Sequence, residues 1–172
     1  PALIIAHDVE TMPECVVAAE KYDVTLLKSG KDTSEIIVTM MTRLNNALAP
    51  KIMRHGVFVE VYGEGLLIIG ESGMGKSETA LELIKRGHRL ISDDAVNIKK
   101  INSSTLMGTA PDLIRNYIEL RGIGVVDVRH IFGNGAVKMG EKIDLVVRLE
   151  TWKQDATYDR LGNNTQYIDI LG

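Results

Sequence analysis

Hydrophobic and polar residues follow two different periods along the chain, and the switches between these periods predict an α/β fold. In the first fifty residues, short apolar runs predict strands, and apolar positions three or four residues apart predict helices. The expected order is strand, helix, strand and helix, over residues 3–6, 12–22, 24–27 and 33–48. Two short strands joined by a helix predict a right-handed parallel crossover.

The second of these helices carries one continuous apolar face. It includes Met40 and Met41, which we expect to be packed as core. Ala49-Pro50 then ends the helix, because the residue before a proline is driven away from helical backbone angles. We therefore place a domain boundary here, with residues 1–50 on one side and residues 51–172 on the other.

The remainder of the chain is richer in predicted strands. Residues 57–62 alternate between the two faces of a strand, Gly63-Glu64-Gly65 is a turn, and residues 66–69 form a wholly apolar strand. Further strands are expected at residues 89–92, 95–98, 142–150 and 166–171, and helices at residues 76–86 and 113–120. The mixture of both elements again indicates an α/β domain.

Composition narrows the class of protein without deciding it. The chain has 172 residues, of which 45% are hydrophobic and 25% charged, which is typical of one folded domain or of one domain with part of another. The net charge of −3 argues against a protein that binds nucleic acid or membranes mainly by electrostatics. The single cysteine, Cys15, excludes an internal disulfide and fits a cytoplasmic location. No apolar run approaches the ~18 residues that a membrane span needs.

Both ends of the sequence interrupt the pattern. The chain opens at Pro1 with no initiator methionine and enters an apolar run at once, and it closes at Leu171-Gly172 directly after another such run. We expect a fragment, with part of a smaller α/β domain at its start and part of the second domain absent from its end.

The strongest chemical signal is a glycine-rich stretch between a predicted strand and a predicted helix. It reads Gly70-Glu71-Ser72-Gly73-Met74-Gly75-Lys76-Ser77, which matches the phosphate-binding pattern G-x-x-x-x-G-K-[ST]. Glycines let main-chain N–H groups converge on phosphate oxygens, and the start of the helix adds positive charge. Lys76 would contact the β- and γ-phosphates of a nucleotide and Ser77 would bind Mg²⁺. This stretch predicts a P-loop.

An acidic pair follows sixteen residues later, at the end of the strand over residues 89–92. Asp93 and Asp94 would lie at the edge of the sheet where α/β proteins bind ligands, and could hold Mg²⁺ or accept a proton. Neighbouring side chains of an extended chain point apart, so we expect different roles for the two. Glu119, which precedes Gly122 and Gly124, could complete a metal shell, but an exposed glutamate near a helix end is the favoured interpretation from spacing alone.

Taken together, these segments resemble the HPr kinase/phosphorylase family of bacteria with low-GC genomes. The matching segments are residues 55–57, 70–83, 85–94, 118–128, 131–133 and 158–162. Residues 118–128 are similar to the family signature, with Ile118, Leu120 and Ile123 in place of its usual leucine, isoleucine and leucine. The resemblance is strong from about Arg54 onward and looser over residues 1–50.

The resemblance implies a P-loop kinase core similar to that of phosphoenolpyruvate carboxykinase. The implied enzyme uses ATP or pyrophosphate with Mg²⁺ to phosphorylate a regulatory serine of the phosphocarrier protein HPr, and its reverse activity uses inorganic phosphate to release pyrophosphate from phosphoserine. It further implies a role in carbon catabolite repression and a homohexamer activated by a glycolytic bisphosphate.

Site residues also follow from the resemblance. It implies Asp94 as the proton acceptor in phosphorylation and the proton donor in dephosphorylation, Lys76 as a phosphate contact, and Ser77 and Glu119 as Mg²⁺ ligands. His55 and Arg160 are implied as further active-site residues, although a lone histidine and a loop arginine carry little signal by themselves. Asp93 would be an auxiliary acid.

Two other functions fit the phosphate-binding motif. A different P-loop kinase acting on a small molecule would need a lid with several arginines, and no such cluster appears beyond Arg115, Arg121 and Arg129. A nucleotide-sensing regulatory module would bind ATP without transferring phosphate. Transfer of labelled phosphate to HPr separates these two alternatives from the kinase.

Overall fold

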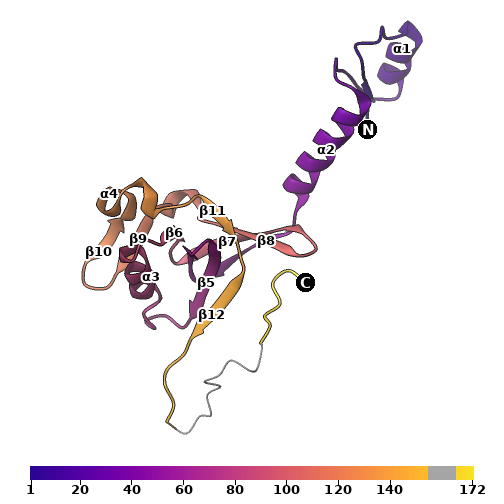
Figure 1. The fold of residues 1–172 in the computed structure, drawn as a ribbon. Coiled ribbons are helices and arrows are strands. Elements are labelled where there is room, and N and C mark those ends of the chain that lie inside the picture. The colour runs from indigo at the N-terminus through magenta and orange to yellow at the C-terminus, as the bar shows by residue number, and fades with distance from the viewer. Residues whose placement is uncertain (155–165) are drawn as a thin grey trace. The chain divides into compact units, whose positions relative to one another are not determined.

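The computed structural model describes residues 1–154 and 166–172 (Figure 1). It divides the chain into two compact units, Pro1–Ala49 and Pro50–Gly172. Ala49, which ends the last helix of the first unit, has extended backbone angles (φ −55°, ψ 132°), as expected for a residue before proline. In the described parts of the chain no helix is long and apolar enough to cross a membrane.

The first unit has the expected order of strand, helix, strand and helix. These elements are β1 (Ala2–Ile5), α1 (Pro13–Lys21), β2 (Thr25–Lys28) and α2 (Thr33–Leu48). The two strands are parallel, with Ala2 opposite Thr25 and Ile5 opposite Lys28, which confirms the predicted parallel pairing.

The prediction that the apolar face of α2 is buried as core is wrong. Met40 is 41% exposed and Met41 is 60% exposed, and neither α1 nor α2 has a buried residue. The reason lies in the size of the unit, because a two-stranded sheet and a single short helix provide too little apolar surface to cover a helix of 16 residues.

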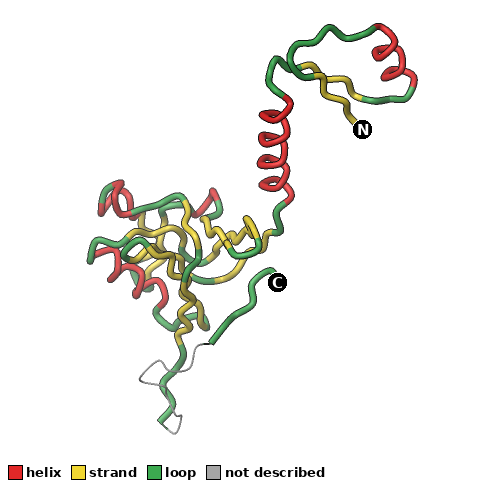
Figure 2. Tube along the Cα trace, turned by 45° about the vertical axis from the view of Figure 1, so that its right-hand side comes forward, coloured by secondary structure: helices red, strands yellow, loops and turns green. Residues whose placement is uncertain are grey.

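The second unit is built from two four-stranded sheets, a hairpin and short helices (Figure 2). Its strands are β3 (Lys51–His55), β4 (Val57–Val61), β5 (Glu64–Gly70), β6 (Arg89–Ser92), β7 (Ala95–Asn102), β8 (Thr105–Thr109), β9 (Tyr117–Leu120), β10 (Gly124–Asp127), β11 (Gly140–Lys142) and β12 (Leu145–Leu149). Its helices are α3 (Lys76–Lys85), α4 (Val128–Phe132) and the short 3₁₀ turns η1 (Asp112–Ile114) and η2 (Asn134–Ala136). The first sheet has the order β12-β5-β4-β6, the second has the order β11-β8-β7-β3, and β9 and β10 pair with each other.

Alternating side chains of β4 and β5 supply two separate cores. Val57, Val59 and Ile68 face α3 and pack with its Ala80 and Ile84. The residues between them face the second sheet, where they form the other core. Its buried members are Phe58, Leu67, Ile91, Val96, Ile98 and Ile170. The period-two pattern predicted for residues 57–62 therefore produces a strand that is covered on both faces.

Phe58 shows how closely the two sheets approach. The nearest atom of its ring would lie 2.5 Å from a Cβ built on Gly108 of β8, so only glycine leaves room for the ring at that point.

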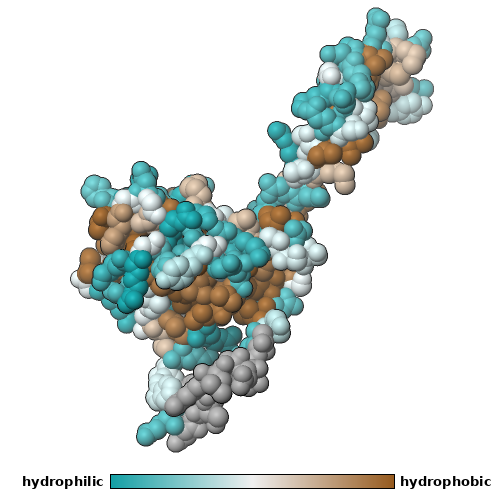
Figure 3. All heavy atoms as spheres, viewed as in Figure 1, coloured by the Kyte–Doolittle hydropathy of each residue, from teal (hydrophilic) through white to brown (hydrophobic). Residues whose placement is uncertain are grey.

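Hydrophobic surface is exposed over β5 and β12 (Figure 3). On the edge strand β12, Leu145 and Val147 remain exposed.

Two predicted elements of the second unit are wrong. Residues 113–120 are not a helix, because Asn116 adopts a left-handed backbone (φ 70°) and the chain then continues as β9, with Ile118 and Leu120 buried. Residues 166–171 are not a strand. Instead, Ile170 packs into the second core, and the carbonyl of Leu171 accepts a hydrogen bond from Lys100 Nζ at 3.1 Å.

Candidate functional site

The glycine loop, residues 70–77, joins the inner strand β5 to α3. Gly73 and Gly75 have positive φ angles of 86° and 85°, which favour glycine at both positions. Gly75 is the N-cap of α3 and makes no side-chain cap hydrogen bond, so no cap side chain occupies the N–H groups of the first helical turn. The Lys76 ammonium donates to the carbonyl oxygens of Gly70 at 3.0 Å and Glu71 at 2.8 Å.

Asp93 lies at the end of β6 and connects three segments of the site. Its Oδ1 accepts a hydrogen bond from the Ser77 hydroxyl at 2.8 Å, and its Oδ2 accepts the main-chain N–H of Glu119 at 2.9 Å. The residue is 4% exposed. Burial raises the pKa of its carboxyl above the ordinary value, although the hydrogen bonds from Glu119 and Ser77 oppose that shift.

Asp94, the next residue, lies in the opposite environment. Its side chain is 75% exposed, and its backbone is left-handed (φ 65°), which is uncommon for a residue with a side chain. The main chain of this turn is held by Gly56 N–H, which donates to the Asp94 carbonyl at 3.0 Å. The side chain of Asp93 is thus buried, whereas that of Asp94 is open to solvent.

His55 ends β3 beside this turn. Its Nδ1 lies 3.2 Å from the Asp94 carbonyl oxygen and 3.6 Å from the Asp94 carboxylate Oδ1. Both side chains are exposed, so the imidazole is placed to contact the carboxylate while both remain open to solvent. Sequence reasoning alone gave this histidine little weight, because the adjacency comes from the pairing of β3 with β7, in which His55 stands opposite Ala95.

These segments enclose a cavity of about 170 Å³. The glycine loop, the acidic pair and β9 meet there, and the lining residues are Val57, Ser72, Gly73, Gly75, Lys76, Ser77, Glu78, Asp93, Asp94, Glu119 and Arg121. Strand–loop–helix geometry thus brings together most of the predicted site residues. Glu119 belongs to strand β9, so its interpretation as a residue near a helix end is wrong.

Some predicted site residues lie apart from the cavity lining. Gly70, Glu71 and Met74 belong to the glycine loop but do not line the cavity, and the Met74 sulfur instead lies 3.7 Å from the Thr151 hydroxyl. Arg160 falls outside the described residues. Within residues 1–154 and 166–172, no group of three or more His, Cys, Asp or Glu side chains could hold a metal ion.

Arg121 lines the cavity, and the site residues proposed from the sequence did not include it. Its guanidinium lies against Gly73 of the glycine loop. The sequence feature that points to Arg121 is the pair of glycines that follows it, Gly122 and Gly124. In the structure both glycines have positive φ angles and turn the chain from β9 into β10.

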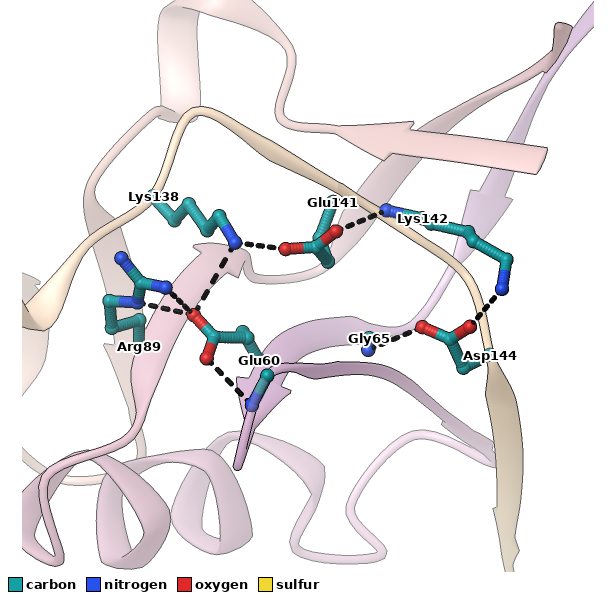
Figure 4. A network of polar contacts seen from close by, with 8 residues as sticks. Glu60, Gly65, Arg89, Lys138, Glu141, Lys142 and Asp144 are labelled. Atoms are coloured by element: carbon teal, nitrogen blue, oxygen red, sulfur yellow. Dashed lines mark hydrogen bonds and ion pairs between the residues drawn. The ribbon is translucent and has the colours of Figure 1, made fainter. Parts of the chain in front are cut away.

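A second charged cluster lies elsewhere in the same unit, and we call it the Glu60 network (Figure 4). Buried Glu60 pairs with Arg89 and with Lys138, and it accepts the N–H of Gly63 at 2.9 Å. Its other ion pairs are Lys138 with Glu141, and Lys142 with Asp144. Asp144 also accepts the N–H of Gly65 at 2.9 Å.

The pKa values in this network reflect its pairing. The hydrogen bond from Lys138 lowers the pKa of Glu141. Burial would raise the pKa of Asp144, but the bonds from Lys142 and from Gly65 N–H outweigh burial and lower it. Asp144 in turn raises the pKa of Lys142.

Comparison with known proteins shows the family of the chain. The family described as "HPr Serine kinase C-terminal domain" matches residues 46–172. The chain belongs to the HPr kinase/phosphorylase family. The HPr kinase/phosphorylase of Caldicellulosiruptor bescii is 54% identical over 172 residues, which are 100% of this chain and 55% of that protein. The Bacillus licheniformis protein of the same name is 47% identical over 171 residues, which are 99% of this chain and 55% of that protein.

A solved structure supports the membership. The Hpr(Ser) kinase/phosphatase from Coxiella burnetii superposes with a TM-score of 0.60 at 35% identity, over 65% of this chain and 67% of that one. The mixed α/β architecture with several sheets is therefore that of an HPr kinase structure. The chain spans about 55% of the length of the curated relatives that it matches.

Proposed function

We propose that this chain forms a P-loop catalytic core, similar to that of phosphoenolpyruvate carboxykinase, which transfers phosphate from ATP or pyrophosphate to a serine of HPr. The relatives named HPr kinase/phosphorylase support HPr as the substrate and a phosphorylase activity. We propose that in this reverse reaction inorganic phosphate attacks phosphoserine and pyrophosphate is released. The observation that carries the proposal is the convergence of Lys76, Ser77 and Asp94 on one cavity.

The glycine loop supplies the phosphate site. Its N–H groups and the ammonium of Lys76 would neutralise the β- and γ-phosphates. The Lys76 ammonium is held by two main-chain carbonyls, and neutral acceptors are easier to give up than a carboxylate when a phosphate arrives.

Asp94 would act as the base. An exposed carboxylate at the cavity rim can accept the proton of an incoming serine hydroxyl, and can return a proton to the serine oxygen in the reverse direction. His55 would orient this carboxylate from a distance of 3.6 Å. We propose Arg160 as a further active-site residue on the resemblance alone.

The residues present fit a divalent cation. Because Ser77 donates its proton to Asp93, its oxygen lone pairs are left for a metal, and Glu119 lines the same cavity. Mg²⁺ is commonly bound through one or two protein oxygens together with substrate phosphates, so Ser77 and Glu119 would hold it. When bound, Mg²⁺ would offset the negative charge of the phosphates. Asp93 would be the auxiliary acid that positions Ser77.

The proposed setting follows from the family. We propose that the protein acts in the cytoplasm in carbon catabolite repression, as a homohexamer, with HPr as its partner rather than a nucleic acid or a membrane.

The decisive experiment measures transfer of labelled phosphate from ATP to purified HPr by the wild type and by Asp94→Asn. Loss of the base should lower the rate by about 10²- to 10⁴-fold while ATP binding is retained. Asp112→Asn is the matched control, because this exposed carboxylate pairs with Arg115 outside the cavity. A variant as fast as the wild type would remove Asp94 from the role of base.

The same assay separates the rival functions. A wild-type protein that binds ATP but labels neither HPr nor a small-molecule acceptor would be a nucleotide sensor, and labelling of a small molecule alone would indicate a different P-loop kinase. Release of pyrophosphate from phosphorylated HPr and inorganic phosphate tests the reverse activity.

A further inference from the structure

A groove of about 470 Å³ lies on the outer face of the second sheet. Val96 and Ile98 of β7 are buried in the second core, so Asn97 and Lys99, which alternate with them, face the opposite side. Side chains of β3 and β8 complete the groove, which shares no lining residue with the cavity at the glycine loop. We call it the Lys51 groove, and its outward-facing side chains are Lys51, Met53, Asn97, Lys99, Met107 and Thr109.

The register of the strands arranges these side chains in two rows. Lys51 stands opposite Lys99, and Lys99 stands opposite Met107. The second row is formed by Met53, Asn97 and Thr109. Directly opposite residues of antiparallel strands point to the same face of a sheet. The groove therefore combines two cationic side chains, two thioethers and two neutral polar groups.

The two lysines stand where like charges disfavour the fold. The N–H of Lys100 donates to the Pro50 carbonyl at 2.9 Å, so the next pair along, Lys51 and Lys99, is of the closer, non-hydrogen-bonded kind. Like charges directly opposite each other destabilise a sheet. No described aspartate or glutamate lines the groove, and no ion pair within 4.0 Å in residues 1–154 and 166–172 includes Lys51. An anion between the two ammonium groups would offset their repulsion.

The methionines indicate the other half of the ligand. Met53 is 62% exposed, and Met107 is half-buried. Unbranched thioethers adapt to the shape of an apolar partner, and the stems of the lysines add apolar surface beneath their charges. The volume of the groove lies within the range of about 300–1,000 Å³ that is typical of small-molecule sites. A purely polar anion would leave the methionines in water, so the groove favours an anion that also has an apolar body.

We propose that the Lys51 groove binds a small organic anion, with its charged group between Lys51 and Lys99 and its apolar body against Met53 and Met107. The site is separate from the proposed function, because the groove and the cavity at the glycine loop have no lining residue in common. Binding in the groove should therefore persist when pyrophosphate occupies the glycine loop.

The test uses two fluorescent probes that differ in charge. 8-Anilinonaphthalene-1-sulfonate carries a sulfonate, whereas N-phenyl-1-naphthylamine has the same aromatic body without it. Wild-type protein should bind the sulfonate probe about tenfold more tightly than the neutral probe, and saturating pyrophosphate should leave both affinities unchanged. Exposed apolar surface elsewhere, as on β12, lacks this preference for charge, so the difference between the probes measures binding in the groove.

Two substitutions separate the charged half of the site from the apolar half. Lys51→Met removes the charge but keeps an unbranched side chain, so it should weaken the sulfonate probe by about tenfold and leave the neutral probe unaffected. Because it also removes a like-charge contact, it should not lower the melting temperature. Met53→Gln keeps the length of the side chain but makes it polar, and it should weaken both probes. The matched control is Lys28→Met, on exposed β2 outside the groove, which should bind both probes like the wild type.

Three results would overturn the proposal. The first is an affinity for the sulfonate probe that equals the affinity for the neutral probe or that Lys51→Met leaves unchanged. The second is displacement of the sulfonate probe by pyrophosphate, which would place that probe at the glycine loop. The third is loss of probe binding as the protein concentration rises, with a matching increase in mass by sedimentation, which would show that a second copy of the chain covers the groove.

Discussion

The second unit contains two clusters of charged residues, and they differ in whether their cations are paired with carboxylates. In the Glu60 network each described lysine and arginine contacts a carboxylate, and Glu60 itself is buried. In the cavity, the Lys76 ammonium donates to two main-chain carbonyls. Among the described residues, neither Lys76 nor Arg121 forms an ion pair with a carboxylate within 4.0 Å.

We propose that this difference separates charges that hold the fold from charges that contact a ligand. Removing one partner of a paired and partly buried ion destabilises the fold, because the other charge is left uncompensated. A cation held by neutral carbonyls, or by packing against a glycine, keeps its charge for the ligand at some cost in stability. We therefore expect substitutions in the cavity to affect activity far more than stability, and substitutions in the Glu60 network to do the reverse.

The largest effect is expected for Lys76→Met. Methionine keeps most of the length of the side chain but removes the cation next to the phosphates, so transfer to HPr should fall by at least about 10³-fold. Because the exposed ammonium donates to two main-chain carbonyls and pairs with no carboxylate of the described residues, the melting temperature should change by less than about 2 °C. The assay is labelled-phosphate transfer, with thermal melting as the check on folding.

Lys85→Met is the matched control. Lys85 ends α3 and pairs with Glu82 on the exposed helix surface, so both rate and melting temperature should stay near the wild-type values. A Lys76→Met variant that melts many degrees lower with nearly normal transfer would reverse the comparison and make Lys76 a structural residue.

An element could be predicted from the sequence where the pattern that specifies it lies within a short segment. The strand–loop–helix around Gly70 and the parallel β1–β2 pair were predictable, because apolar runs and the glycine motif lie within short segments. The strands β3, β8, β10 and β11 were not predicted, because each is short and its pairing partner is set by tertiary contacts. The predicted helix at residues 113–120 failed for the same reason, since Ile118 and Leu120 are buried only once β9 has paired with β10.

The site shows the same division. Gly73, Lys76 and Ser77 follow from one motif, whereas the hydrogen bond from Ser77 to Asp93 joins residues sixteen positions apart, and that from Glu119 to Asp93 joins residues twenty-six apart. Arg121 could not be placed in the cavity from spacing, because its contact with Gly73 is made across the fold.

A smaller effect, and one on stability alone, is expected for Glu60→Gln. The substitution keeps the shape of the side chain but leaves Arg89 and Lys138 without their shared buried carboxylate. Since both cations retain some access to solvent, the loss should be about 2 kcal/mol of unfolding free energy, or roughly 6 °C in melting temperature. Transfer activity per folded molecule should be unchanged.

Glu150→Gln provides the exposed counterpart. Its ion pair with Arg148 is long, at 4.0 Å, and open to solvent, so its removal should change the melting temperature by less than about 1 °C. Equal melting temperatures for Glu60→Gln and Glu150→Gln would show that burial does not distinguish the network from an ordinary surface pair.

The smallest effects, and the sharpest contrast in sign, come from pH. Burial raises the pKa of Asp93, so the folded state binds a proton more tightly than the unfolded state, and Asp93 lowers stability as pH rises from its unfolded value through its folded value. The pKa of Glu141 is lowered by Lys138, so its contribution is present above its unfolded value and is lost as pH falls through its folded value. Melting temperatures of the wild type, Asp93→Asn and Glu141→Gln between about pH 3 and pH 8 measure both contributions. Relative to the wild type, Asp93→Asn should become more stable as pH rises, whereas Glu141→Gln should become less stable. Opposite slopes are expected because burial disfavours the charged form of Asp93, whereas Lys138 favours the charged form of Glu141. If the melting temperatures of the two variants changed with pH in parallel, the cavity carboxylate and the network carboxylate would respond to protons in the same way.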